Sequence, residues 1–249
     1  MFEIKAIVLA GGYAKRLWPL TKELAKPLVD INGRPVIAYI LTALDKSKHI
    51  SEVLISTNTK FEDSFKGWLA TQKFSKPVKV VAEPTTNEGE KLGAIGGINF
   101  VLESQNINDD IFVAGGDNLA GIDVDAMIAQ FVSKEKSVVG VYDIKELGRV
   151  KQYGEVKIDK NKKIIHSIEK PSHPETTLIS TCFYIFPKGI RNKINSYVKA
   201  GNNKDAPGFF VDWLFKKTDV YAYVFDSYWF DIGDHQTLEQ AREFAKKNL

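Results

Sequence analysis

The sequence predicts an α/β protein in which a mixed, mostly parallel sheet is flanked by helices and carries an antiparallel extension. Short apolar segments alternate with segments of helical periodicity through the first half of the chain, a pattern typical of βαβ units. The second half instead groups several strands before its last helices, which indicates an antiparallel portion. Because the 249 residues contain no Pro/Gly/Ser-rich linker and no internal repeat, we expect a single domain over residues 1–249.

The strands of the first half are expected at short segments rich in β-branched and other apolar residues. The first of them contains Ile7-Val8-Leu9, and such a run fits a strand that is buried on both faces of the sheet. We expect the fifth strand to continue the same alternation of strands and helices. The five predicted strands cover residues 4–9, 53–56, 78–82, 111–114 and 137–142.

Helices are predicted between these strands, and the first begins with Pro35, a residue favoured at the first helical position. In the second half, a polar segment between two strands is expected to form a hairpin turn. The helices of the first half cover residues 35–45, 61–70, 92–104 and 124–131. The second half contains predicted strands at 154–158, 164–169 and 178–186, the turn at 159–163, and helices at 189–198 and 236–247.

Composition and charge exclude several classes of protein. The 34 basic and 31 acidic residues give a formal charge of +3, and the sequence has no basic stripe of the kind that binds nucleic acid. Cys182 is the one cysteine, which excludes an intramolecular disulfide and a cysteine-based metal site, and its apolar surroundings predict a buried structural thiol. No apolar run is long enough to cross a bilayer and no signal peptide is recognisable, so we expect a cytoplasmic protein without a membrane partner.

A glycine-rich loop that carries cations follows the first predicted strand. Ligands of parallel sheets lie at the carboxyl ends of the strands, and the pair Gly11-Gly12 lets backbone N–H groups approach an anion closely. Arg16 can bind phosphate oxygens with two N–H groups, and Lys26 adds a compact charge. The loop lacks the Gly-Lys-Ser/Thr of the P-loop and the third glycine of the dinucleotide fingerprint. A turn with surface cations is the alternative, but this spacing favours phosphate binding.

Two aspartates each follow a short apolar strand. Asp117 lies in a Gly-Gly-Asp-Asn segment, and Asp231 lies in a Trp-Phe-Asp-Ile-Gly segment. Mg²⁺ is typically bound by one or two carboxylates together with substrate phosphates, so both are candidate ligands. Each aspartate taken alone is better explained as a turn or cap residue, and the sequence does not show that the two meet. Asp234 is expected to cap the last helix.

Together these motifs resemble those of the sugar-phosphate nucleotidylyltransferase family, with the glucose-1-phosphate thymidylyltransferases as the closest group. The motifs are Gly-Gly-x-x-x-Arg-Leu-x-Pro-Leu-Thr and Lys-Pro in the loop, then Gly-Asp-Asn, Tyr-Gly, Glu-Lys-Pro and Trp-x-Asp-x-Gly, in the family's order. The resemblance covers nearly the whole chain and implies a Rossmann-like fold with an antiparallel sugar-binding extension. It also implies transfer of a nucleotidyl group from a nucleoside triphosphate to a sugar 1-phosphate, with release of pyrophosphate.

The resemblance also implies a role for each matching residue. Two polyanions must be brought together in this reaction, so cations are needed between them. The implied catalytic cations are Arg16, Lys26 and Lys170. The nucleotide would be bound by Gly11, Gly12, Glu83 and Gly93, and the sugar phosphate by Tyr153, Gly154, Glu169 and Tyr184. The cofactor would be Mg²⁺, held by Asp117 and Asp231.

Three positions depart from the family's pattern. Ala14-Lys15 stands where Gly-Thr is usual, and Ala14 could still serve in the loop if its φ is negative. Cys182 replaces a glycine near the sugar, and Glu83 replaces a glutamine that faces the base. An ionised Glu83 accepts hydrogen bonds, and uracil, thymine, cytosine and guanine all offer N–H donors. We expect dTTP or UTP with glucose 1-phosphate, and a homo-oligomer is compatible with the family.

Two other functions remain open from the sequence. A phosphocholine cytidylyltransferase would use similar phosphate loops and would need an aromatic cage for the quaternary ammonium, with Trp213, Tyr228 and Trp229 as candidates. A non-catalytic nucleotide-sugar-binding regulatory subunit would explain the altered Ala14-Lys15 segment. Tests of the corresponding substrates and of pyrophosphate release would distinguish these functions.

Overall fold

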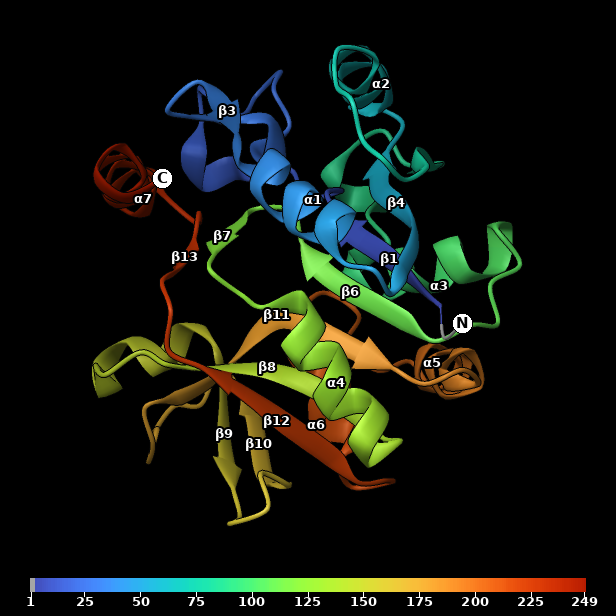
Figure 1. The fold of residues 1–249 in the computed structure, drawn as a ribbon, viewed down its shortest axis with the longest axis vertical. Helices are drawn as coiled ribbons and strands as arrows, with labels where there is room; N and C mark the ends of the chain where they lie inside the picture. The colour runs from blue at the N-terminus through green and yellow to red at the C-terminus, as the bar shows by residue number, and fades with distance from the viewer. Residues whose placement is uncertain (1–2) are drawn as a thin grey trace.

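The structure, a computed structural model, describes residues 3–249 and contains a mixed sheet of nine strands in this range (Figure 1). Its central strands run parallel in the order β6-β1-β4-β5. The first four predicted strands are therefore confirmed. The largest difference in bounds is at β4, which extends beyond the predicted residues 53–56 at both ends. The bounds are β1 (Ile4–Leu9), β4 (Ile50–Asn58), β5 (Val78–Glu83) and β6 (Ile111–Gly115).

The antiparallel part of the sheet begins beside β6, where β11 (Leu178–Phe186) runs against it. The predicted hairpin is confirmed, because β9 (Gly154–Ile158) and β10 (Ile164–Glu169) pair antiparallel across a turn closed by the Asp159 carboxylate. The fifth predicted strand, β8 (Ser137–Asp143), does not continue the parallel order. It pairs antiparallel with β11 and parallel with β12 (Val220–Phe225), a strand that the sequence analysis missed.

Helices cover both faces of the sheet, as Figure 1 shows. On one face lie α1 (Val36–Lys46), α2 (Glu62–Ala70) and α4 (Val124–Lys134). On the other face lie α3 (Gly93–Ser104), α5 (Ile190–Lys199) and α6 (Pro207–Leu214). Strand β1 is buried between them, with Ala6 and Val8 packed on the first face and Ile7 on the second, as predicted.

The polypeptide ends and connections contain several short elements. The last helix, α7 (His235–Asn248), begins at the predicted cap Asp234, whose carboxylate accepts a hydrogen bond from the backbone N–H of Thr237 at 2.8 Å. Pro35 is the residue before α1 rather than its first residue, because it ends the small strand β3 (Arg34–Pro35). The other short strands are β2 (Asp30–Ile31), β7 (Asn118–Ala120) and β13 (Trp229–Asp231).

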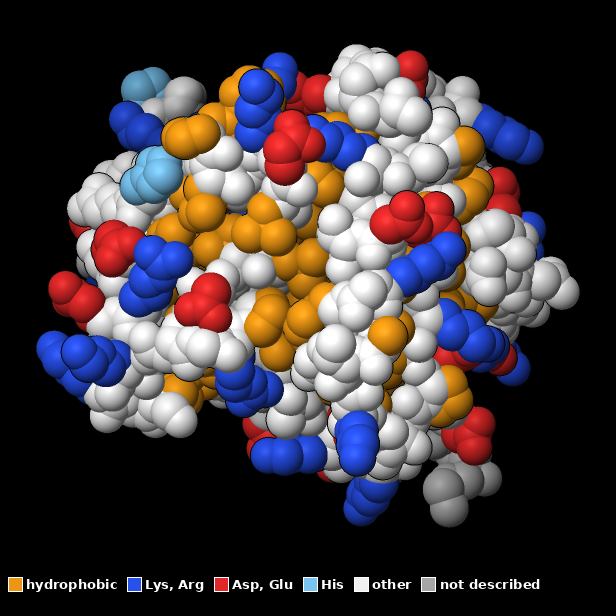
Figure 2. Space-filling model, turned by 90° about the horizontal axis from the view of Figure 1, so that it is seen from above, with side chains coloured by type: hydrophobic (Ala, Val, Ile, Leu, Met, Phe, Trp, Pro, Cys, Tyr) orange, Lys and Arg blue, Asp and Glu red, His pale blue; other side chains and the backbone are white. Residues whose placement is uncertain are grey.

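The surface carries charges of both signs. Figure 2 shows hydrophobic side chains gathered near the middle of the face seen from above, with Lys, Arg, Asp and Glu interspersed around them. This face has no continuous basic stripe, in agreement with the nearly balanced composition. None of the helices in residues 3–249 combines the length and the apolar character needed to cross a membrane.

Candidate active site

The glycine-rich loop begins where β1 ends, at the point where the order of the parallel strands reverses. Strand β4 lies on one side of β1 and β6 on the other, and open α/β sheets bind ligands at such a switch point. The loop is anchored on both sides. The Asn58 amide donates to the carbonyl of Gly11 at 2.9 Å, and the backbone N–H of Gly116 donates to Leu9 at 2.9 Å. These hydrogen bonds hold the loop in place, so that Gly11 and Gly12 line the two cavities described below.

The condition of a negative φ at Ala14 is not met, since the residue has φ 45° and ψ 45°, in the left-handed region. The surrounding contacts hold this conformation. Its carbonyl accepts hydrogen bonds from the Thr21 hydroxyl at 2.8 Å and from the backbone N–H of Leu17 at 3.0 Å. The left-handed residue starts a single 3₁₀ turn, Lys15–Leu17, which presents Lys15 and Arg16 beside the glycines.

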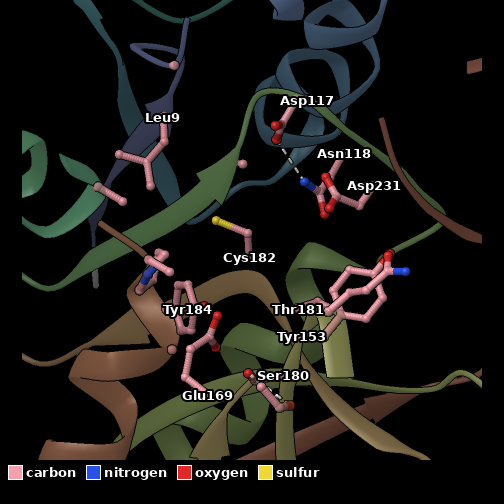
Figure 3. Close-up of a pocket in the computed structure, with 18 of the residues that line it drawn as sticks. Leu9, Asp117, Asn118, Tyr153, Glu169, Ser180, Thr181, Cys182, Tyr184 and Asp231 are labelled. Carbon is pink, nitrogen blue, oxygen red and sulfur yellow. Dashed lines mark hydrogen bonds between the residues drawn. The ribbon is translucent and has the colours of Figure 1, made fainter. Parts of the chain in front are cut away.

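Two short strands bring the candidate metal ligands together. Strand β13 pairs antiparallel with β7, with Asp231 opposite Asn118, the neighbour of Asp117. The backbone N–H of Ile232 donates to the carbonyl of Asp117 at 3.1 Å, and Figure 3 shows the two aspartates beside Asn118 at one end of the cavity. The proximity that the sequence could not establish therefore follows from the β7–β13 ladder.

Asn118, to which the sequence analysis gave no role, and Trp229, which it named only for a choline cage, both support the metal-binding pair. The Asn118 amide donates to Oδ1 of Asp117 at 2.9 Å and accepts the indole N–H of Trp229 at 2.8 Å. The Trp229 ring in turn packs edge-on against Tyr153, with ring centroids 5.2 Å apart. This chain of contacts fixes the orientation of the Asp117 carboxylate. Its only signal in the sequence is the position of both residues within the two aspartate motifs.

Lys26 forms an ion pair with Asp117 at the centre of the cleft. Burial works against both charges, but the charge and hydrogen bond of Lys26 bring the pKa of Asp117 below its ordinary value. Burial also lowers the pKa of Lys26, yet the nearby Asp117 and Asp231 leave it raised overall. For Asp231, burial and then the charge of Asp117 raise the pKa to about 6. An additional cation would therefore stabilise ionised Asp231.

The donor set fits a Mg²⁺ ion that is shared with a substrate. No group of three or more His, Cys, Asp or Glu side chains gathers as a metal cage among the described residues. Asp117 and Asp231 form instead a pair of carboxylates. The raised pKa of Asp231 means that its ionised form is unfavourable in this environment. Mg²⁺ commonly uses one or two carboxylates and completes its shell with water and phosphate oxygens. The pair suits that mode of binding.

Two adjoining cavities contain all of the candidate site residues. The larger, of about 490 Å³, and the smaller, of about 380 Å³, share a boundary formed by Gly11, Gly12, Arg16 and Asp117. The larger cavity is lined by Tyr153, Gly154, Glu169, Lys170, Tyr184 and Asp231. The smaller is lined by Lys26, Glu83 and Gly93. The structure thus gathers residues from both halves of the chain around one junction.

Glu169 presents a carboxylate to the larger cavity. Its backbone N–H donates to Asp212 at 2.6 Å, which fixes the end of β10 against α6. The carboxylate lies against Gly208, where a Cβ atom would be 1.8 Å from Oε2, and near Gly154, where a Cβ would be 2.8 Å away. Burial raises the pKa of Glu169 to about 7, and the charge of Lys170 opposes this effect. Gly208 and Asp212 are supporting residues that the sequence analysis missed.

Cys182 lines the larger cavity and also packs against the core of one sheet face. Figure 3 shows its sulfur in the middle of the cavity, with Asp117 and Asp231 on one side and Glu169 on the other. The side chain is only partly buried, which corrects the expectation of a fully buried thiol. Low solvation, and then the nearby aspartate charges, raise the pKa of the thiol well above its ordinary value. The thiol is therefore a poor nucleophile in this position.

The smaller cavity has a carboxylate of its own. Glu83 is 5% exposed at the end of β5, and burial raises its pKa, while a hydrogen bond from the Thr85 hydroxyl at 3.0 Å lowers it. Two glycines face this carboxylate, since a Cβ on Gly11 would be 3.7 Å from Oε1 and a Cβ on Gly97 3.5 Å from Oε2. A flat ring could approach the backbone here. The α3 residue Gly93 has φ 75°, which favours glycine at that helix start.

The three aromatic residues that a choline cage would need do not gather. Trp213 packs against Tyr197 in the cluster of one sheet face, and Tyr228 packs on Phe244 beside α7. Of these three residues, only Trp229 lines the larger cavity. The three residues named from the sequence therefore do not form a cage for the quaternary ammonium of phosphocholine.

Comparisons with known proteins agree with this geometry. A protein-family model described as nucleotidyl transferase matches residues 5–248. A Sulfolobus acidocaldarius protein, described as a mannose-1-phosphate guanyltransferase, is 30% identical over 231 residues, which are 92% of this chain and 60% of the relative. A Synechocystis UTP–glucose-1-phosphate uridylyltransferase is 29% identical over 240 residues, again 92% and 60% of the two chains. The chain thus spans about three fifths of the length of these relatives.

Solved structures share the fold. A Bacillus anthracis protein described as a glucose-1-phosphate thymidylyltransferase superposes with a TM-score of 0.84 at 22% identity, covering 99% of this chain and 96% of that one. A UDP-glucose pyrophosphorylase complexed with UDP-glucose gives a TM-score of 0.83 at 18% identity, covering 99% and 100%. At these identities the likeness establishes the Rossmann-like α/β architecture with its added antiparallel strands.

Proposed function

The chain belongs to the nucleotidyl transferase family, and from this premise we propose that it transfers a nucleotidyl group from a nucleoside triphosphate to a sugar 1-phosphate. The products are a nucleoside diphosphate sugar and pyrophosphate. The main support is the arrangement of the two cavities, which meet at Gly11, Gly12, Arg16 and Asp117. A nucleotide in the smaller cavity and a sugar phosphate in the larger would bring their phosphates together at this junction.

The chemistry at the junction is a single displacement at phosphorus. An oxygen of the sugar phosphate forms a bond to the α-phosphorus of the triphosphate, and the bond from that phosphorus to the β-phosphate bridging oxygen breaks. Both electrons of the broken bond leave with pyrophosphate, so no covalent enzyme intermediate is needed. A mechanism without a covalent intermediate agrees with the high pKa of the Cys182 thiol. The protein is then required to position the substrates and to neutralise their charges.

The cations of the site divide between the two substrates. Arg16 lines both cavities and is placed to bind the phosphate that is attacked. Lys26 faces the nucleotide cavity and Lys170 faces the sugar cavity, so each substrate meets a charge of its own. Asp117 and Asp231 would hold Mg²⁺, which would neutralise phosphate charge when bound. With Asp117 engaged by the metal, Lys26 would be free to bind a phosphate oxygen.

We further propose UTP or dTTP as the nucleotide and glucose 1-phosphate as the acceptor. The Glu83 carboxylate already accepts hydrogen bonds from the Thr85 hydroxyl and from the Leu92 backbone, so it has little capacity left for donors of a base. Uracil and thymine each present one N–H on the pairing edge, whereas guanine presents two adjacent donors. The named relatives include enzymes for GTP with mannose 1-phosphate and for UTP with glucose 1-phosphate, so both pairs belong in the test.

The test is a panel of UTP, dTTP, GTP, CTP and ATP against glucose 1-phosphate, mannose 1-phosphate and phosphocholine, with pyrophosphate release as the readout. We expect release only when a sugar 1-phosphate and Mg²⁺ are both present. Asp117→Ala should lower turnover by at least about a hundredfold, because it removes a metal ligand and leaves Lys26 unpaired. Asp109→Ala, at an exposed surface position, is the matched control.

Other outcomes would identify the remaining candidates. Release with CTP and phosphocholine alone would establish the cytidylyltransferase. No release with any pair, together with binding of a nucleoside diphosphate sugar, would establish the regulatory subunit. A cytoplasmic location and a homo-oligomer stay predictions from the sequence, to be checked by fractionation and light scattering.

A further inference from the structure

The nucleotide cavity is charged, yet its charges are compensated. A nucleoside triphosphate carries several negative charges, and a cavity with a clear positive excess would be the simplest site for its tail. Here basic and acidic side chains are equal in number along the lining. The basic residues are Lys15, Arg16, Lys26 and Lys91, and the acidic residues are Glu83, Glu88, Asp117 and Asp205.

Three of the four cations are held in ion pairs across this cavity. Lys26 pairs with Asp117 at the junction. Lys15 pairs with Glu88 in the 3₁₀ turn η3 (Glu88–Glu90), so a side chain of the glycine loop reaches the segment before α3. The chain of charges continues along the rim, because Lys91 approaches Glu88 at 3.9 Å and binds Asp205 at 2.8 Å.

From these contacts we infer that Lys15 is a third phosphate-binding cation of the loop, which Glu88 holds in the nucleotide-free protein and which the triphosphate tail takes over. This inference deepens the proposed function and rests on it. Lys15 stands at one of the positions where the loop departs from its family, beyond the roles that the resemblance assigns to Arg16 and Lys26. The ligand class is a linear triphosphate, or its pyrophosphate product.

The backbone of the loop places Lys15 for this exchange. Ala14, in the left-handed conformation, stands directly before the turn Lys15–Leu17. Lys15 and Arg16 are adjacent residues of this turn, and both line the nucleotide cavity. The Lys15 side chain is 59% exposed, and its partner Glu88 is 36% exposed. An ion pair with that much solvent contact contributes little to stability, whereas a hydrogen bond between two charged groups is stronger, so Lys15 can exchange Glu88 for a phosphate.

The experiment compares binding of inorganic triphosphate, of UTP and of UMP to the full chain with Mg²⁺ present, measured by titration calorimetry. Lys15→Met keeps the aliphatic stem and removes the charge. We expect it to weaken inorganic triphosphate and UTP by about tenfold and to leave UMP nearly unchanged. Glu88→Gln should tighten the two triphosphates by about threefold, because Lys15 is then unpaired. The double variant should bind as Lys15→Met does.

The control is the exposed pair Lys66–Glu62 on α2, whose 2.6 Å ion pair lies outside both cavities. Lys66→Met and Glu62→Gln should change none of the three dissociation constants. Equal affinity of Lys15→Met and wild type for inorganic triphosphate would overturn the inference, as would weaker binding in Glu88→Gln. Absence of triphosphate binding by the wild type would overturn it as well. Because binding needs no turnover, an inactive protein that still shows the predicted pattern would refute the proposed function alone.

Discussion

Glu169 carries the most informative single charge of the larger cavity. Its carboxylate points into the space proposed for the sugar and has a pKa of about 7 because it is poorly solvated. Sugar hydroxyls donate hydrogen bonds, and the ionised form of Glu169 is the better acceptor. Binding of the sugar phosphate should therefore depend on pH near neutrality.

We predict that the KM for the sugar 1-phosphate falls as the pH rises through about 7, the pKa of Glu169. The substrate phosphate also titrates, near about 6, so wild type must be compared with Glu169→Gln. The variant should bind the sugar more weakly at high pH and should lose the step near neutrality. Parallel pH profiles of the two proteins would contradict the role of Glu169.

The raised pKa of Glu169 also affects the stability of the fold. Stability should change with pH in the opposite direction to sugar binding. Between the ordinary pKa of 4.5 and the folded value of about 7, folded Glu169 binds more protons than the unfolded chain. Stability therefore falls as the pH rises through this window. Glu169→Gln should flatten this part of the profile, which urea unfolding at several pH values would measure.

Cys182 offers a chemical reporter of the larger cavity, because it is the only cysteine of the chain. We predict slow alkylation by iodoacetamide, since the pKa of the thiol is raised well above its ordinary value. Glucose 1-phosphate should slow it further by covering the sulfur, as read by mass spectrometry. UMP should have a much smaller effect. Protection by UMP but not by the sugar phosphate would contradict the assignment of the two cavities.

Residues with a role of their own were easier to find in the sequence than residues that support them. Arg16, Lys26 and Asp117 stand in recognisable motifs. By contrast, Gly208 and Asp212 support Glu169 from a distant helix, and nothing local in the sequence connects them. The positive φ of Ala14 also has no signal in the sequence, because contacts with Thr21 outweigh the local preference of alanine.

At the scale of elements, α6 is the support of the sugar cavity. Its first turn contains Gly208, against which the Glu169 carboxylate lies. We predict that Gly208→Ala raises the KM for the sugar phosphate by about tenfold, because the new methyl group displaces a carboxylate at the end of a flexible side chain. The KM for the nucleotide should change little, as measured by initial rates.

Gly67→Ala in α2 is the matched control. Apart from the neighbouring residues and backbone of its own helix, no heavy atom lies within 4 Å of a Cβ at Gly67, so the variant should keep both Michaelis constants. It should also be more stable by about 0.5–1 kcal/mol, since alanine is the better helix former. An equal effect of both glycine substitutions on the sugar KM would argue against the contact with Glu169.

The β7–β13 ladder is the element that orients the metal-binding pair. Trp229→Phe keeps the ring packing and removes the indole donor to Asn118, the residue that fixes Asp117. We predict a kcat lower by about tenfold at low Mg²⁺ with partial recovery at high Mg²⁺, because losing a supporting contact weakens metal binding. Trp68→Phe, on α2, should behave as wild type. An effect on kcat that is independent of Mg²⁺ would contradict this positioning role.

The elements that the sequence analysis missed are short or of unclear period. Helix α6 has eight residues, no side-chain cap at its start and an apolar composition that strands share. Strand β8 was correctly bounded to within one residue, but its neighbours depend on β11 and β12, which come much later in the chain. Local sequence patterns predict whether a segment forms a helix or a strand better than they predict which strands it pairs with.

For the whole molecule, the architecture explains why the site joins distant segments. The central strands place the glycine loop and Asp117 at one edge, where the strand order reverses. The returning chain then adds β13, which brings Trp229 to Asn118 across 111 residues of sequence. The sequence predicts the parallel part from its periodicity, but contacts at such separations depend on tertiary packing.

In the proposed reaction, a sugar phosphate oxygen attacks the α-phosphorus at the junction of the two cavities. The most direct measurement uses a sugar 1-phosphate whose phosphate oxygens carry ¹⁸O, with the best triphosphate from the panel, and mass spectrometry of both products. We expect all of the label to stay in the nucleoside diphosphate sugar and none to appear in pyrophosphate. Label in pyrophosphate, or pyrophosphate formed without the sugar product, would contradict the proposed reaction.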